Sequence, residues 1–115
     1  MPRDYRLYLE DIVEEIQHID QFIAGQTFES FQADVQLMYA VLHALTVIGE
    51  AAGNIPVAIR EQYPAVDWQG FRGLRNVITH QYPNIRLERL WEVIEHELPD
   101  LAVTVEAILA DVEGR

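Results

Sequence analysis

Apolar residues recur at helical spacing along the N-terminal third of the chain. In residues 3–24 an apolar side chain returns every three or four positions, and the acidic residues mostly face away from that stripe. Gly25 follows as a C-terminal cap. Thr27 and Asp34 are both possible N-caps, the first for a short helical turn and the second for a long helix that ends near Ala52. The pattern therefore predicts two long helices joined by a short helical segment.

The second of these long helices, over residues 35–52, is apolar almost all round. Such a helix is buried on more than one side. In a small domain it lies at the centre of a bundle, at a subunit interface, or both. We expect Gly49 to permit close helix approach and His43 to lie in the core. Glu50 needs a cationic partner if it is buried, and the arginines farther along the chain can supply one.

Helical signals continue in the middle of the chain. Pro56 begins a short helix over residues 57–62, because proline is well tolerated at a first helical position. Asp67 is placed to cap the next helix, and Pro83-Asn84 forms the turn after it. These signals predict a helix that begins after Asp67 and is followed by the turn at Pro83-Asn84.

The last third of the chain keeps the same period. Apolar positions from Leu87 to Leu98 predict a further helix, Pro99 interrupts it, and the stripe continues from Leu101 to Val112 in a last helix. No stretch alternates as a β-strand does, and no repeat or low-complexity run is present. The prediction is an all-α fold, an up-and-down bundle of about five helices that forms one domain over residues 1–115.

Composition narrows the possible functions. Half of the 115 residues are hydrophobic, enough for a core without covalent staples. The chain has no cysteine, which excludes disulfides, thiolate metal sites and cysteine nucleophiles. No signal peptide and no apolar run of about twenty residues is visible, so we expect a soluble, cytoplasmic protein without membrane contact.

Charge is distributed unevenly. The net charge of −11 argues against nonspecific binding of nucleic acid. Residues 7–34 and 92–113 contain acids and no arginine, whereas four arginines and one acid, Glu88, lie between Trp68 and Leu90. The chain contains no lysine, so every side-chain cation other than histidine is a planar guanidinium, which is suited to phosphate.

The arginine-rich region includes a helix with two distinct faces. At about 100° per residue, its polar side chains fall within an arc of roughly 140° that contains no acid. These polar residues are Arg72, Arg75, Asn76, Thr79 and His80. The opposite face is apolar and docks on a core through Phe71, Leu74, Val77 and Ile78. An acid-free set of guanidinium, amide, hydroxyl and imidazole groups is a candidate functional site.

The spacing limits what one copy of this helix can do. Arg75 and His80 are five residues apart, so in a straight helix they point about 140° away from each other. They meet around one small substrate only if the helix ends before His80 or if a second copy faces the first. Pro83 favours the first option by disfavouring helical geometry at Tyr82. The second option requires a homodimer.

Several reaction classes are excluded by the residues available. His80 has no acid or histidine at helical spacing nearby, so a metal site is not expected. Ser30 is the only serine and has no nucleophile elbow around it, and no Walker loop is present. What remains is one histidine, which can transfer a proton, and several arginines, which can bind an anionic group.

That combination suits metal-free RNA cleavage, among other options. The 2′-hydroxyl is the nucleophile, so the protein has only to move protons and stabilise the charged phosphorane. DNA lacks the 2′-hydroxyl and would not be cut in this way. The structural alternative is that His80 caps the helix end and the arginines pair with acids of neighbouring helices.

The segment from Arg75 to Tyr82 resembles the R-N-x-x-x-H-x-Y signature of HEPN-domain toxins, in particular the HepT-like family. The similarity extends over nearly the whole chain. It also involves residues 6–12, 48–52, 63–68 and 90–99.

This resemblance implies an α-helical homodimer whose two motifs line a shared cleft. It implies metal-independent endoribonuclease activity without a cofactor, with Arg75 and His80 catalytic and Asn76 supporting. It also implies a small MNT-type nucleotidyltransferase antitoxin as partner, which can transfer AMP to the motif tyrosine, Tyr82. We count Arg72, Thr79 and Glu50 as further supporting residues.

Two positions depart from the family pattern. Pro83 stands where the family often has an aromatic residue, and Arg86 stands where an acidic cap is common. Both alter the rim of the cleft. A second hypothesis is therefore kept: a non-catalytic helical module that presents a nucleotide or a substrate to a nucleotidyltransferase. The presence of both Arg75 and His80 favours the ribonuclease.

Overall fold

The computed structural model describes residues 3–81 and 84–114, and every regular element in these two ranges is helical. The all-α prediction is therefore confirmed for this part of the chain. The elements are α1 (Tyr5–Ile23), α2 (Phe28–Ala33), α3 (Val35–Gly53), α4 (Val57–Gln62), α5 (Trp68–Gln81), α6 (Leu87–Glu92), the π-helical turn η1 (Val93–Glu97) and α7 (Leu98–Glu113).

Local capping sets these boundaries as the sequence predicted. The side chain of Thr27 accepts from the Ser30 N–H at 3.1 Å and so begins α2, and Asp34 accepts from the Leu37 N–H at 3.0 Å and begins α3. Gly25, after α1, has a φ of +75°, which glycine adopts without strain. The chain reverses between α1 and α3 because these caps stop one helix and start the next.

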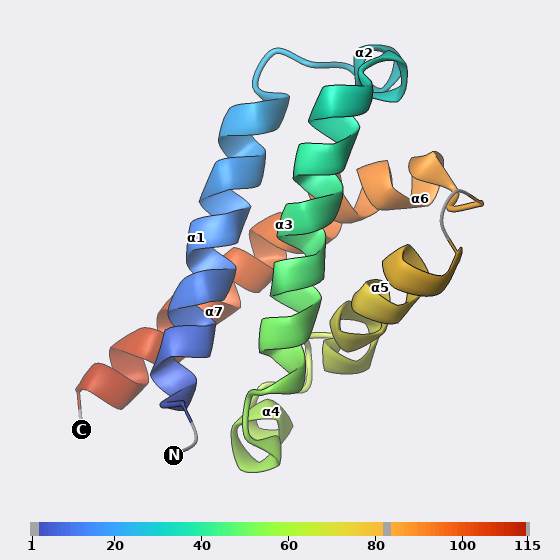
Figure 1. Cartoon of the computed structure of the whole chain (residues 1–115). Coiled ribbons are helices and arrows are strands. Elements are labelled where there is room, and N and C mark those ends of the chain that lie inside the picture. Colours follow the sequence, from blue (N-terminus) through green and yellow to red (C-terminus); the bar gives the residue numbers. More distant parts are fainter. Residues whose placement is uncertain (1–2, 82–83, 115) are drawn as a thin grey trace.

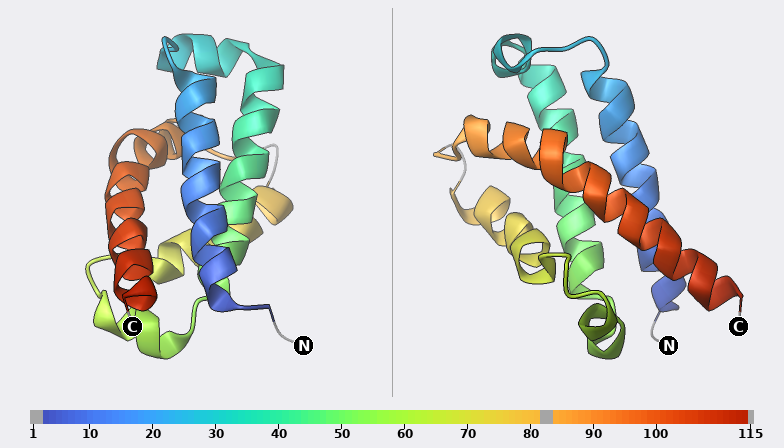
Figure 2. Two further views of the ribbon diagram at one scale, coloured as in Figure 1. Left: turned by 90° about the vertical axis from the view of Figure 1, so that its left-hand side faces the viewer. Right: turned by 180° about the vertical axis from the view of Figure 1, so that it is seen from behind.

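Helices α1 and α3 lie side by side and antiparallel, and α5 packs against the C-terminal half of α3 (Figure 1). Seen from behind, α6, η1 and α7 form one long helical rod that crosses this pair obliquely (Figure 2). The core consists of the apolar stripes of these helices. Its fully buried larger members include Leu9, Ile12, Ile19, Phe31, Leu45, Ile48, Leu90, Leu98, Leu101 and Ile108.

Helix α3 is the central helix of the fold, but one of its faces is open. It is apolar and long enough to cross a membrane by length and composition alone, a test that core helices of soluble proteins also pass. Val35 and Tyr39 are more than half exposed. His43 is also exposed, so the expectation that it lies in the core is wrong. The error follows from the apolar residues around it, which made this face look buried.

The predicted interruption at Pro99 is also wrong. Pro99 lies in the first turn of α7 and follows directly on η1, so its missing N–H falls where the α-helical hydrogen-bond pattern is already shifted. The irregularity comes earlier, in η1, where the Leu98 N–H donates to the Val93 carbonyl five residues before it. The chain therefore stays helical from Leu87 to Glu113 through one π-helical turn.

Candidate functional site

Helix α5, which contains the polar face, rests directly on α3. A Cβ added at Gly49 would lie 2.7 Å from the carbonyl oxygen of Phe71 and 3.2 Å from the backbone nitrogen of Arg75. The predicted close approach at Gly49 is confirmed. Asp67 caps α5 as expected, because its Oδ1 accepts from the Gly70 N–H at 2.9 Å. The start of α5 is further fixed by Trp68, which is buried.

A polar hollow of about 300 Å³ lies where α5 crosses the C-terminal end of α3. It is lined by Gly49, Glu50, Gly53, Asn54, Arg72, Arg75 and Asn76. Glu50 forms an ion pair with Arg75, with 2.7 Å between Oε2 and Nε. The arginine that Glu50 was expected to find is therefore Arg75, although Glu50 is exposed rather than buried. The hollow gathers four of the predicted site residues from two helices.

The Glu50–Arg75 pair leaves part of the guanidinium available. It uses Nε, and no described residue bonds to either Nη nitrogen of Arg75. Both side chains are about half exposed, so the pair adds little to stability, about 1 kcal/mol at most. The side chain of Arg72, exposed beside the pair, has no hydrogen bond or ion pair to the residues described. The pair thus orients Arg75 while its planar edge can still bind an anion.

These contacts agree in part with the structural alternative, in which the arginines pair with acids of neighbouring helices and His80 caps the helix end. Arg75 does pair with an acid of a neighbouring helix, and Arg89 of α6 pairs with Glu97 at 2.7 Å. His80, by contrast, makes no capping bond or ion pair within the described ranges and is exposed. The alternative therefore holds for Arg75 and fails for His80, and the partner of Arg89 lies in its own helical rod rather than in a neighbouring helix.

The far end of α5 separates His80 from Arg75. The helix continues through Gln81, so the option that it ends before His80 is wrong. The reason is that a proline disfavours helical backbone geometry only at the residue before it, which here is Tyr82. Helix α5 can therefore continue through Gln81. Thr79 and His80 are exposed and do not line the polar hollow. Tyr82 and Pro83 lie outside the described residues. In one copy, Arg75 and His80 therefore project in different directions.

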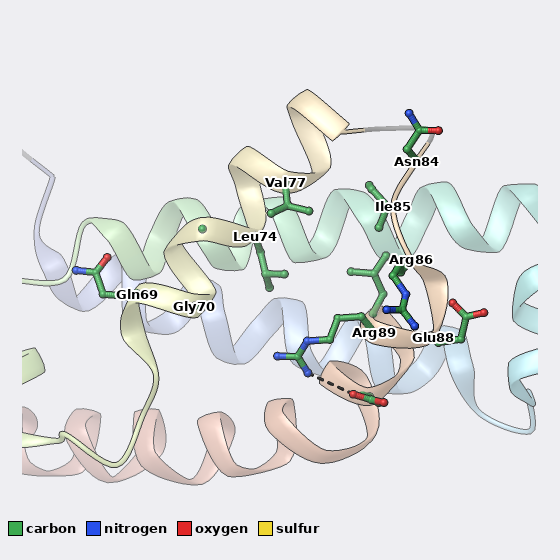
Figure 3. Close-up of a pocket in the computed structure, with 12 residues that line it drawn as sticks. Gln69, Gly70, Leu74, Val77, Asn84, Ile85, Arg86, Glu88 and Arg89 are labelled. Atoms are coloured by element: carbon green, nitrogen blue, oxygen red, sulfur yellow. Dashed lines mark ion pairs between the residues drawn. The ribbon is translucent and has the colours of Figure 1, made fainter.

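A second and larger hollow, the α5–α6 groove, lies between α5 and the start of α6 (Figure 3) and shares no lining residue with the polar hollow. Its volume is about 510 Å³. It is lined by Gln69, Gly70, Gly73, Leu74, Val77, Asn84, Ile85, Arg86, Glu88, Arg89, Leu90 and Glu92. Helix α5 therefore has a hollow on each side.

Sequence reasoning missed two residues of the polar hollow. Gly53 faces Arg72, since a Cβ there would lie 3.4 Å from its Cγ, and Asn54 donates from Nδ2 to the Glu50 carbonyl at 2.8 Å. The four-residue spacing of Gly49 and Gly53 was the available signal, because it places both glycines on one side of α3. Among residues 3–81 and 84–114, no group of three or more histidines and acids is placed to hold a metal ion.

Comparison with known proteins assigns the chain to a family. The family described as "Ribonuclease HepT-like" matches residues 12–108. "Putative RNase MJ0127" of Methanocaldococcus jannaschii is 36% identical over 115 residues, which cover 99% of this chain and 95% of that protein. "Probable ribonuclease HepT" of Thermococcus cleftensis is 35% identical over 88% of this chain and 92% of its own length. No solved structure matches the chain. The chain belongs to the HepT-like ribonuclease family.

Proposed function

We propose that this protein is a metal-independent endoribonuclease that acts in the cytoplasm as the toxin of a toxin–antitoxin pair. The observation that carries the proposal is the polar face of α5. There, Arg75 is oriented by Glu50 with both Nη nitrogens available, and His80 is exposed on the same helix. Membership in a family of ribonucleases supports the same chemistry. Cleavage of RNA by the purified chain in EDTA is the direct test.

The chemistry assigns one role to each of these groups. His80 takes the proton that the 2′-hydroxyl loses as its oxygen attacks phosphorus. It then gives that proton to the 5′-oxygen as the bond from phosphorus to that oxygen breaks. The Nη nitrogens of Arg75 hold the non-bridging oxygens, where negative charge develops. Asn76, beside Arg75 in the polar hollow, adds a neutral amide donor. No metal and no cofactor is needed for these steps.

A composite site formed by two copies reconciles this chemistry with the geometry. Because α5 stays helical through His80, Arg75 of one copy and His80 of another can face one phosphate only across a two-fold axis. The open face of α3, with Val35 and Tyr39 exposed, offers apolar surface for such an association. The proposal is therefore a homodimer.

We expect light scattering to give a dimer at micromolar concentration, and mixing of two inactive variants to restore activity. An exchanged Arg75→Ala and His80→Ala heterodimer keeps one composite site intact. With half of the dimers mixed, the activity should return to about a quarter of the wild-type value. Each variant alone is the control. A monomer, or a mixture that stays inactive after subunit exchange, would remove the composite site.

The proposed antitoxin is an MNT-type nucleotidyltransferase that modifies Tyr82. The phenolic oxygen attacks the α-phosphorus of ATP, pyrophosphate leaves, and the phenolic proton passes to solvent. Tyr82 follows His80 by two residues, so the attached AMP would place a negative charge and bulk next to the site where the RNA phosphate binds.

We expect Tyr82→Phe to cleave RNA as the wild type does and to escape inactivation by the antitoxin with ATP. The phenyl ring keeps the bulk of the side chain but lacks the oxygen that accepts AMP. Mass spectrometry of the co-expressed proteins should show the AMP mass on the wild type and not on the variant. An unmodified toxin that its partner silences fully would instead point to steric masking.

A further inference from the structure

The α5–α6 groove takes no part in the chemistry proposed above. Its volume of about 510 Å³ lies within the range of small-ligand sites. One wall is apolar: the side chains of Leu74, Val77 and Ile85 converge there from α5 and from the segment before α6 (Figure 3). All three are half-buried. A flat, partly apolar group would cover them.

Gly73 keeps the groove open, and nothing in the fold requires a glycine there. A Cβ added at Gly73 would meet no atom within 4 Å. Glycine inside a helix is unfavourable relative to alanine, so packing and helix propensity would both accept a larger residue. Gly70 is different, because a Cβ there would collide with the capping carboxylate of Asp67. The missing side chain at Gly73 therefore points to something that occupies the groove.

The charged groups at the groove leave one cation and one acid unpaired. Arg89 pairs with Glu92 at 3.5 Å and with Glu97 at 2.7 Å. The side chains of Arg86 and Glu88, both exposed, have no hydrogen bond or ion pair with any residue in the described ranges. A nucleotide matches this set: a phosphate binds a guanidinium, and the N–H groups of a base can donate to a carboxylate.

The groove also lies on the same side of α5 as His80. His80 follows Val77 by three residues and Gly73 by seven, and both spacings return to the same side of a helix. A strand whose scissile phosphate sits at His80 can therefore place a neighbouring nucleotide in the groove. Arg75 and the polar hollow lie on the other side of the helix.

We propose that the α5–α6 groove binds one nucleotide of a single-stranded RNA substrate, next to the phosphate that is cleaved. The base lies against Leu74, Val77 and Ile85, and Arg86 binds the adjacent phosphate. This proposal rests on the ribonuclease function proposed above. It makes Arg86 and Gly73 substrate-binding positions rather than catalytic ones.

The test is binding of a fluorescently labelled single-stranded RNA to the full-length His80→Ala chain, which leaves the RNA uncut. Arg86→Ala in this His80→Ala chain should raise the Kd for RNA about tenfold. It should also lower the slope of log Kd against log salt concentration by about 0.7, which is the value for one phosphate contact on a single strand. Arg6→Ala, which removes an exposed arginine of α1, is the matched control and should change neither quantity.

Filling the groove gives an independent measurement. Gly73→Leu should raise the Kd about tenfold or more, with the helical circular dichroism spectrum unchanged, because the added side chain occupies the space of the base. Ala107→Leu places a leucine side chain at an exposed position of α7 and should bind RNA as the parent does.

The outcomes separate this proposal from the one it rests on. Unchanged Kd values for Arg86→Ala and Gly73→Leu, in a protein that binds and cleaves RNA, would overturn the groove proposal alone. A Gly73→Leu chain that loses its dimeric state would assign the groove to contact between copies and overturn it as well. A wild-type chain that neither binds nor cleaves RNA would overturn both.

Discussion

His80→Ala and Arg75→Ala should each lower the rate of RNA cleavage by about a hundred- to ten-thousand-fold. A positioned proton-transfer group contributes about this much to catalysis, and a group that binds developing charge contributes about as much. The fold should persist, because both side chains are exposed. When Arg75 is removed, Glu50 loses its partner but stays exposed to solvent. The free energy of unfolding should therefore fall by about 1 kcal/mol or less.

The measurement is cleavage of an end-labelled RNA in EDTA, with a DNA of the same sequence beside it. Arg3→Ala, which removes a paired arginine near the start of α1, is the matched control and should cleave at the wild-type rate. Cleavage that needs a divalent metal, or that proceeds equally on DNA, would contradict the mechanism. A wild-type chain that binds the nucleotidyltransferase but cuts no RNA would favour the non-catalytic module.

A glycine-to-alanine substitution should change stability in opposite directions at Gly49 and at Gly73. Alanine in a helix is favoured over glycine by about 1 kcal/mol. Gly73→Ala should raise the free energy of unfolding by up to about that amount, because the added Cβ meets only open space. At Gly49 the Cβ would be 2.7 Å from the Phe71 carbonyl, backbone that cannot rotate away, so α5 must shift. Overpacking of this kind costs about 1–3 kcal/mol, which outweighs the gain in propensity.

Urea unfolding followed by circular dichroism measures both effects. The midpoint should fall for Gly49→Ala and rise for Gly73→Ala relative to the wild type. Because α5 carries Arg75 directly over Gly49, the first variant should also lose RNA cleavage while its helix content stays the same. Equal stabilisation by the two substitutions would show that α3 and α5 do not approach closely in solution.

Most of the helices could be predicted because their signals are local. Thr27, Asp34 and Asp67 each bond to a backbone N–H three residues ahead, so the sequence beside each cap contains the whole interaction. The contact at Gly49 was also predictable, because a glycine within a long apolar helix indicates close approach by another backbone.

What the sequence did not show depends on residues that are distant along the chain. The polar hollow exists because α5 crosses α3 at Gly49, and no helical period specifies which residues of α3 will face Arg75. The choice of Glu50 as partner followed from charge, whereas Asn54 had no such signal. His43 was misplaced because an apolar neighbourhood in sequence does not say which side of a central helix stays uncovered.

The π-helical turn η1 has a consequence for the length of its segment. Such a turn holds one residue more than an α-helical turn and still closes in about one full rotation, so it takes in the extra residue without turning α7 by about 100° more. Before the turn, Trp91 stacks near Phe31, with 5.2 Å between ring centroids, whereas after it α7 packs on α1. One rod thus faces two different partners. Residues 93–97 therefore tolerate changes at exposed Glu95 and His96 and also the loss of one position, because an α-helical turn there would leave the apolar stripe of α7 against α1. Insertion of one further residue would turn that stripe away by about 100°.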